Sequence, residues 1–399
     1  MLVPKLRFKR EDGTDYPEWE KDKWSALGDF VASGTLSKAD LAETGTPCIL
    51  YGELYTKYGE IAHTIYSKTS ATSHTFSQYD DVILPKSGET PEDISTATCV
   101  PYDNISLGGD LIVFRHNEKV IGAYLSYLIS NRAKNAIANI AQGKSVVHIN
   151  EKSLANIELS YPDTEEQQKI ADFLSTVDEV IAQSEAEVQN LEQQKKAAMQ
   201  KIFSQEVRFQ REDGTDYPEW ENTSLGKIGD VAMCKRILKE QTSENGDVPF
   251  FKISTFGGTP DAYISYQLFN DFRQTYRFPQ KGAILISAAG TIGKTVRYNG
   301  EDAYYQDSNI VWLEHDDSVV DDFLYQFYQQ VSWEGLEGST IKRLYNKNLL
   351  ETPISLPCLE EQQKIADFLS AYDEAIRYAK QELDKWKELK KGLLQQMFV

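Results

Sequence analysis

The chain has little of what a metal site, a disulfide framework or a membrane anchor requires. Its four cysteines, Cys48, Cys99, Cys234 and Cys358, are far apart and form no C-x-x-C pair, which argues against structural zinc and against disulfides. The five histidines lack metal-ligand spacing, and no apolar run approaches the roughly 18 residues of a membrane helix. The first ten residues contain no apolar core of a secretory signal. We therefore expect a cytoplasmic protein with no metal, no cofactor and no membrane partner.

An excess of basic residues is also missing. The chain has 42 Lys and Arg against 61 Asp and Glu, which gives a formal net charge of −19 over 399 residues. This balance argues against a protein that coats nucleic acid through bulk electrostatics. It leaves open a protein that binds nucleic acid through local patches.

The sequence contains two segments that each occur twice. The first, the frame, is residues 6–20, which recur as residues 207–221 with 13 of 15 positions identical. The second, the repeated block, is residues 165–175, which recur as residues 360–370 without any difference. The interiors between these blocks show almost no mutual identity. The chain therefore consists of two units of about 200 residues, in which near-identical frames surround divergent inserts. This pattern predicts one scaffold that presents two different binding surfaces.

The repeated block after each insert predicts a long helix. Its apolar residues follow steps of four and three, the heptad seam of a coiled coil, and Lys195 and Lys390 occupy the same seam position in the two copies. Pro162 and Pro357 precede the helices and block their extension toward the N-terminus. We expect the helices, at 165–204 and 360–398, to pair antiparallel within one chain; a coiled coil between two chains is the alternative. The seam residues are Ile170, Leu174, Val177, Ile181, Leu191, Ile365, Leu369, Tyr372, Ile376, Leu383 and Trp386.

The inserts have the pattern of mixed α+β domains. Residues 81–84, 283–287 and 309–313 are typical of strands, and residues 120–130 and 320–331 of helices. Each of these helices is followed by a Gly-containing basic segment and a short apolar strand. The two inserts thus share an order of elements without sharing residues.

One segment resembles a catalytic motif. Residues 283–295 end in Gly293-Lys294-Thr295, as a phosphate loop does, but Ala288 replaces the first glycine. The residues that follow predict a strand, whereas phosphate binding needs a helix N-terminus there. We therefore expect a Gly-rich binding loop and no catalytic residue, with a nucleotide hydrolase as a weaker alternative.

The whole pattern resembles the specificity subunit of type I restriction-modification systems. The resemblance rests on residues 165–181, residues 360–376, the doubled frame and the Gly-Thr-Ile-Gly-Lys element after residues 283–287. It implies an α+β fold with a pseudo-twofold internal repeat, in which two long antiparallel coiled-coil helices separate two globular target-recognition domains. The implied boundaries are 1–161 and 207–357 for these domains, and 162–206 and 358–399 for the helices.

The resemblance also implies the function and the partners. Each target-recognition domain would recognise one half of a bipartite, asymmetric site in double-stranded DNA, and the helices would set the spacer. The subunit would have no catalytic activity and would assemble with two methyltransferase subunits and two restriction (translocase) subunits. A protein-binding coiled-coil adaptor and a DNA-mimicking inhibitor are the opposing interpretations.

Polar and basic side chains on loops are the groups that contact base edges and phosphates. The candidates in the first domain are Lys57, Lys68, Lys86, Ser87, Lys144 and His148. The candidates in the second domain are Lys235, Arg236, Lys252, Arg273, Ser287, Thr291, Lys294, Lys342 and Arg343.

Overall fold

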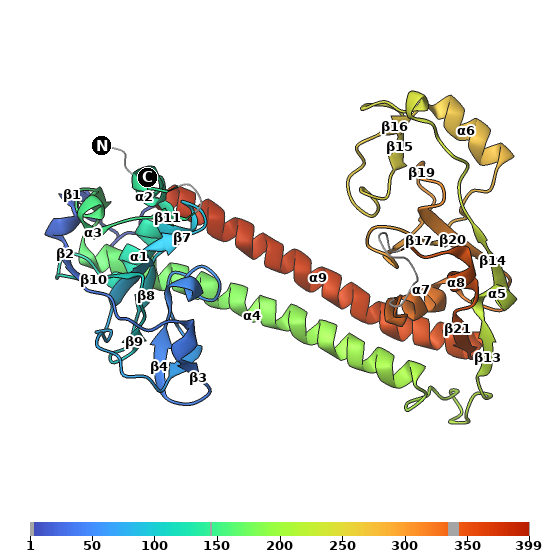
Figure 1. The fold of residues 1–399 in the computed structure, drawn as a ribbon, viewed down its shortest axis with the longest axis horizontal. Coiled ribbons are helices and arrows are strands. Elements are labelled where there is room, and N and C mark those ends of the chain that lie inside the picture. The colour runs from blue at the N-terminus through green and yellow to red at the C-terminus, as the bar shows by residue number, and fades with distance from the viewer. Residues whose placement is uncertain (1–3, 144–145, 334–342, 399) are drawn as a thin grey trace. The chain divides into compact units, whose positions relative to one another are not determined.

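The computed structural model describes residues 4–143, 146–333 and 343–398. The chain divides into two compact units (Figure 1). The first unit comprises Met1–Glu185 with Gln381–Val399, and the second comprises Ala186–Lys380. Among the described residues, no helix has both the length and the apolar character needed to cross a membrane.

The first unit is built around a four-stranded sheet with the order β2-β10-β6-β8. Helix α1 packs against β6 and β8, and β4, β5, β3 and β9 form a second small sheet. The strands are β1 (Glu20–Lys23), β2 (Gly28–Val31), β3 (Leu41–Ala42), β4 (Thr46–Ile49), β5 (Ser67–Thr69), β6 (Asp81–Pro85), β7 (Ser87–Gly88), β8 (Thr98–Val100), β9 (Ser106–Leu107), β10 (Leu111–His116), β11 (Val147–His148) and β12 (Glu158–Tyr161). The helices are α1 (Gly122–Asn131), α2 (Lys134–Ile140), α3 (Glu151–Leu154) and the start of α4 (Thr164–Phe203).

The second unit repeats this architecture with other residues. Its four-stranded sheet has the order β14-β20-β17-β18, and α7 packs against β17 and β18. The strands are β13 (Glu221–Ser224), β14 (Gly229–Ala232), β15 (Val248–Phe251), β16 (Tyr263–Ile264), β17 (Ile284–Ser287), β18 (Thr295–Arg297), β19 (Tyr304–Tyr305), β20 (Ile310–His315) and β21 (Pro353–Leu356). The helices are α5 (Leu225–Ile228), α6 (Tyr266–Thr275), α7 (Asp321–Gln330), α8 (Asn346–Leu350) and the start of α9 (Leu359–Met397), together with the end of α4; the end of α9 belongs to the first unit.

Corresponding strands pair in the same way in both units. The central strand β10 lies antiparallel between β2 and β6, as β20 does between β14 and β17. The small sheets contain the same parallel pair, β4 with β9 and β15 with β19. The prediction that divergent inserts share one order of elements is therefore confirmed.

Helices α4 and α9 lie antiparallel within each unit. In the first unit Asp178 Oδ1 lies 2.6 Å from Lys390 Nζ, and Glu185 Oε1 lies 2.7 Å from Lys387 Nζ. In the second unit the same direction follows from the Glu192–Lys380 and Lys195–Asp373 pairs, at 2.7 and 2.6 Å. The predicted antiparallel pairing within one chain is confirmed in both units.

The predicted seam is buried most deeply where the helices also cover a globular core. Ile170 and Leu174 pack into the first core with Met397, and Ile365 and Leu369 pack into the second with Met199. Burying one such side chain stabilises the fold by about 1.5–3 kcal/mol. Of the other seam residues, Val177 and Leu383 are buried, whereas Ile181, Leu191, Tyr372, Ile376 and Trp386 are half-buried.

Candidate nucleic-acid interface

The repeated frame closes each unit through a buried ion pair. Arg7 Nη2 donates to Glu166 Oε2 at 2.6 Å, and Arg208 Nη2 donates to Glu361 Oε2 at 2.9 Å. Both glutamate side chains are fully buried. The hydrogen bond to Glu361 raises the pKa of Arg208. The ion pair accounts for the repetition of both residues, because a buried carboxylate requires its charged partner.

The two frames also meet a helix end in the same way. The Val207 N–H donates to the Lys201 carbonyl at 3.2 Å, and the Leu6 N–H donates to the Gln396 carbonyl at 3.1 Å. Residues 201 and 396 are equivalent positions of the two repeats. The frames therefore do equivalent jobs, as the repeat predicts, although Leu6 and Gln396 are far apart in the sequence.

The repeated block attaches the helix of each divergent module. Gln167 Nε2 donates to the Lys119 and Pro162 carbonyls, each at 2.8 Å, while Gln167 Oε1 accepts from the Ile121 N–H at 3.0 Å. Gln362 makes the same three bonds to Ser318, Pro357 and Val320. This amide therefore fixes the residues that lead into α1 and α7.

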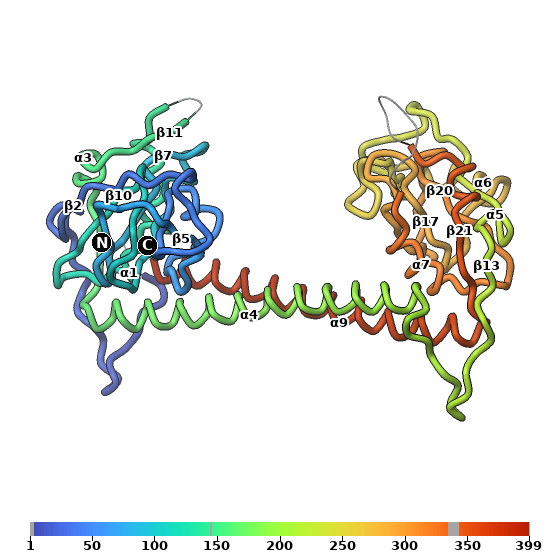
Figure 2. The backbone as a smooth tube through the Cα atoms, turned by 60° about the horizontal axis from the view of Figure 1, so that its bottom comes forward, coloured from blue at the N-terminus to red at the C-terminus, as the bar shows by residue number. Residues whose placement is uncertain are grey.

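Candidate residues of the first module gather at one end of its main sheet. The short strand β7 follows β6 directly and pairs with β11 (Figure 2), so Ser87 Oγ lies 2.9 Å from His148 Nδ1. Lys86 Nζ lies 2.8 Å from Glu151 Oε1. Lys144 belongs to the same segment but lies outside the described residues.

Candidate residues of the second module gather at the corresponding sheet end. Ser287 Oγ donates to the Thr291 carbonyl and accepts from the Lys294 N–H at 2.9 Å. Lys294 Nζ donates to the Phe256 carbonyl at 2.5 Å. Strand β18 follows the turn and pairs antiparallel with β17. The Gly-rich segment is thus a hairpin, and the helix that a phosphate loop needs is not formed there.

Most of the remaining candidates are bound to a neighbouring group of the chain. Arg343 Nη2 donates to the Ser308 carbonyl at 2.6 Å, and Lys342 lies outside the described residues. Lys68 is exposed on β5. Five candidates contact a carboxylate or an aromatic ring: Lys57 (Glu53, 2.8 Å), Lys235 (Tyr276 ring, 5.0 Å), Arg236 (Asp307, 2.8 Å), Lys252 (Asp261, 2.8 Å) and Arg273 (Asp302, 3.5 Å).

A hollow that the sequence analysis missed lies beside each sheet end. In the first module the hollow has a volume of about 670 Å³, and its lining includes the segment after β2 and the residues just before β10. In the second module the hollow has a volume of about 450 Å³, and its lining includes the segment after β14 and the residues just before β20. The polar lining includes Lys38, Lys57 and Asp110 in the first hollow, and Arg236, Lys239, Lys252 and Asn309 in the second. Lys57, Arg236 and Lys252 were candidates, but no local motif marks the hollows, because the first lining comes from three separate segments and the second from four.

A histidine bound to a carboxylate supports the opposite sheet end in each module. His116 Nδ1 lies 3.0 Å from the Asn117 carbonyl oxygen and Nε2 lies 3.0 Å from Asp80 Oδ2. A carbonyl and an ionised carboxylate both accept hydrogen bonds, so this geometry favours the doubly protonated ring. Burial lowers the pKa of His116, but the bonds to Asp80 and Asn117 outweigh it and raise that pKa overall. His315 repeats this arrangement: the bond to Asp321 raises its pKa most, burial opposes this, and the bond to the Asp316 carbonyl raises it further.

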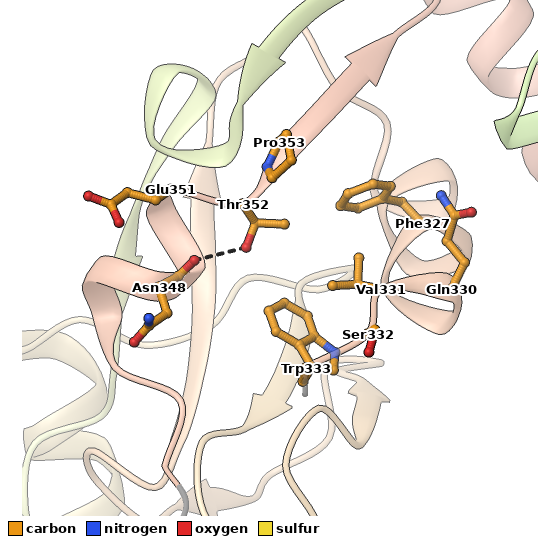
Figure 3. Close-up of a pocket in the computed structure, with 9 residues that line it drawn as sticks. All are labelled: Phe327, Gln330, Val331, Ser332, Trp333, Asn348, Glu351, Thr352 and Pro353. Carbon is orange, nitrogen blue, oxygen red and sulfur yellow. Dashed lines mark hydrogen bonds between the residues drawn. The ribbon is translucent and has the colours of Figure 1, made fainter. Parts of the chain in front are cut away.

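A further pocket lies in the second unit, between the end of α7, α8 and the start of β21 (Figure 3). Phe327, Val331 and Trp333 line one side, and Thr352 Oγ1 donates to the Asn348 carbonyl at 2.9 Å on the other. The lining contains no nucleophile paired with a base. Within the described residues no cluster of His, Cys, Asp and Glu side chains could hold a metal ion.

The repeated architecture coincides with a known family. A family model for the type I restriction modification DNA specificity domain matches residues 17–193 and again residues 217–387. The chain belongs to this family. The two matches fall on the two repeats, and the family resemblance inferred from the sequence is therefore confirmed. They favour neither the adaptor nor the nucleotide-hydrolase alternative.

Individual relatives agree with this family. A provisionally named type I restriction enzyme specificity subunit of Haemophilus influenzae is 54% identical over 150 residues, which cover 37% of this chain and 39% of that relative. The match thus spans less than half of the relative's length. The type I restriction enzyme MjaVIII specificity subunit of Methanocaldococcus jannaschii is 23% identical over 318 residues, 72% of each chain.

Solved structures share the fold. The type I restriction-modification system S subunit from M. genitalium aligns over 100% of this chain and 99% of its own, with 16% identity and a TM-score of 0.64. A chain from a structure of a type I restriction-modification system aligns over 96% and 98%, with 20% identity and a TM-score of 0.55. The α+β fold with two modules and paired helices is thus that of known S subunits.

Proposed function

We propose that this chain is the sequence-specificity subunit of a cytoplasmic type I restriction-modification complex and has no catalytic activity of its own. Each target-recognition domain recognises one half of a bipartite, asymmetric site in double-stranded DNA. The paired helices set the spacer and dock two methyltransferase subunits, and two restriction (translocase) subunits complete the nuclease. The domains are residues 1–161 and 207–357, and the helical regions are residues 162–206 and 358–399.

The observation that carries this proposal is the contrast between constant anchors and divergent sheet ends. Arg7, Glu166 and Gln167 make the same bonds as their repeats in the second unit. The opposite ends of the two sheets differ: one carries Lys86, Ser87 and His148, and the other a glycine hairpin. Equal supports beneath unlike polar loops suit two modules that recognise different base sequences.

Methyltransferase docking is supported by a surface that both units repeat. In the first unit the centroid of the Tyr16 ring lies 5.1 Å from the Arg10 guanidinium and 5.3 Å from Lys169 Nζ. Phe8 packs edge-on against Phe173, which is exposed. The second unit repeats this surface with Arg211, Tyr217, Lys364, Phe209 and Phe368. Tyr16 and Tyr217 are buried, so the exposed part of each copy is Phe173 or Phe368. Two copies of one such surface fit two copies of one protein partner.

An insert exchange tests the proposal. Residues 222–357 would be replaced by the corresponding insert of another family member, and the assembled methyltransferase would be used to map methylated sites. We expect a new sequence in one half of the site, with the other half and the spacer retained. The matched control replaces the first insert and keeps the second. A change in both halves, or in neither, would contradict the modular assignment.

Phe173→Ser and Phe368→Ser test the docking surface separately. Each change should remove one methyltransferase copy from the complex in native mass spectrometry, and the double change should remove both. Retention of both copies by the double variant would exclude this surface.

A further inference from the structure

We propose that Asp110 and Asn309 occupy one base-recognising position that the two target-recognition domains share, and that the difference between these side chains gives each half-site a different base there. This inference rests on the proposed function. Neither residue belongs to the Gly-rich or basic segments that the sequence singles out.

The backbone gives the two residues the same place in the fold. Asp110 directly precedes the central strand β10, and Asn309 directly precedes its counterpart β20. The Asp110 carbonyl accepts the N–H of Lys86, the first residue after β6, at 2.7 Å. The Asn309 carbonyl accepts the N–H of Ala288, the first residue after β17, at 2.8 Å. Each residue is therefore held at the junction between the hollow and the loop that leaves the sheet end.

The side chains are available for a ligand. Asp110 is exposed and Asn309 is half-buried, and both line the hollow of their module. Among the described residues, neither the Asp110 carboxylate nor the Asn309 amide has a hydrogen-bond partner or an ion-pair partner within the chain. Lys38 and Lys57 line the first hollow, and Lys239 and Lys252 line the second. Lys57 is paired with Glu53 and Lys252 with Asp261. The approach of a phosphate backbone, which would bring base edges toward Asp110 or Asn309, therefore relies mainly on Lys38 and Lys239.

Turn geometry favours an aspartate at position 110 but does not account for Asn309. Asp110 has a φ of 54°, in the left-handed region where Asp and Asn are enriched. In the second module the left-handed residue is Ser308, one position earlier, with the same φ of 54°. Asn309 is therefore not required by the backbone, although it stands where Asp110 stands.

The chemistry of the two groups predicts different bases. A carboxylate only accepts hydrogen bonds, so Asp110 suits the N4 amino group of cytosine in the major groove. A carboxamide both donates and accepts, so Asn309 suits the N6 and N7 atoms of adenine. Because Asp and Asn have nearly the same shape, exchanging them alters this hydrogen-bonding pattern with little change in packing.

The test uses the assembled methyltransferase on a DNA library in which both half-sites are randomised. Asn309→Asp should shift the preference at one base position of one half-site by about 5- to 150-fold, the range expected for one base contact. Asp110→Asn should do the same in the other half-site only. Asn309→Ala should relax the preference at that position without creating a new one. Asn299→Asp is the matched control, because Asn299 is exposed in the segment after β18 of the same domain and lines neither hollow.

The outcomes separate this inference from the function on which it rests. Wild-type complex that methylates no bipartite site would overturn the proposed function itself. Normal wild-type activity with unchanged base preference in all three hollow variants would overturn only the shared base position. A uniform loss of methylation across all sequences, with the complex assembled, would also overturn it, because phosphate contacts weaken binding without changing preference.

Discussion

The two repeated tryptophans give the sharpest test of the anchors. Trp220 Nε1 donates to Glu361 Oε2 at 3.0 Å, whereas the equivalent Trp19 Nε1 is buried and has no partner among the described residues. Both rings otherwise have similar aromatic contacts, with Tyr124 and Phe323 at centroid distances of 6.4 Å and interplanar angles of 77° and 80°. Replacing each tryptophan by phenylalanine therefore removes the same indole volume, but only one replacement removes a hydrogen bond.

The magnitude follows from the charge on the acceptor. A hydrogen bond to a charged group contributes about 1.5–3 kcal/mol to stability, whereas removing a buried donor that has no partner loses no such contribution. We expect Trp220→Phe to reduce the free energy of opening of the second unit by about 1.5–3 kcal/mol more than Trp19→Phe reduces that of the first. Native-state hydrogen exchange with mass spectrometry measures both values in the intact chain, because peptides from the two units are distinguished.

The comparison can fail in a clear way. Equal losses in the two units, within about 0.5 kcal/mol, would mean that the Trp220–Glu361 bond adds nothing to the ion pair. A larger loss for Trp19→Phe would mean that packing differences outweigh the hydrogen bond. Either result would refute the assignment of Glu361 as an anchor held by both the arginine and the indole.

Three further predictions concern the same supports. Arg208→Ala should destabilise the second unit by about 3–5 kcal/mol, because it leaves a buried carboxylate without its cation; chemical denaturation followed by hydrogen exchange measures this, and a loss below 1 kcal/mol would contradict it. His116 and His315 have raised pKa values in the folded chain, so their stabilising contribution is complete below the unfolded pKa near 6.5 and declines as the pH rises through the folded pKa. Unfolding measured from pH 5.5 to 9 should show this decline, and the double His→Gln variant should lack it; identical profiles would exclude the histidines. Finally, a permuted chain that begins at residue 207, with residues 399 and 1 joined, should keep its methylation specificity, since Leu6 bonds to Gln396 as Val207 bonds to Lys201; loss of assembly would show that residues 206 and 207 must be continuous.

The two long helices were predictable because each is specified by residues that lie close together in the sequence. The heptad steps and the preceding prolines defined α4 and α9 to within a few residues. The clustering of Lys86, Ser87 and His148 was only partly predictable, because a pairing of two residues, β7 with β11, brings them together across about 60 positions. The hollows were not predictable, because residues near 36, 53 and 110 line one of them and no periodicity connects such positions. Lys294 was singled out as a cation on a flexible turn, whereas its ammonium is bound to the Phe256 carbonyl.

The ion pairs between the helices suggest why the inserts can diverge while their supports do not. The Asp178 carboxylate forms an ion pair with Lys390 of the opposite helix and accepts a hydrogen bond from the Tyr127 hydroxyl of α1, each at 2.6 Å. In the second unit the Asp373 carboxylate forms an ion pair with Lys195 at 2.6 Å and accepts a hydrogen bond from the Gln326 amide of α7 at 2.8 Å. An ionised carboxylate offers about four acceptor sites and does not distinguish a hydroxyl from an amide. The insert therefore needs only some hydrogen-bond donor where Tyr127 and Gln326 stand. The lysine must remain, because its loss would leave the aspartate charge unpaired in a partly buried seam. Constraints of this kind act on a few helix positions of each insert and leave the loops at the sheet ends free to differ.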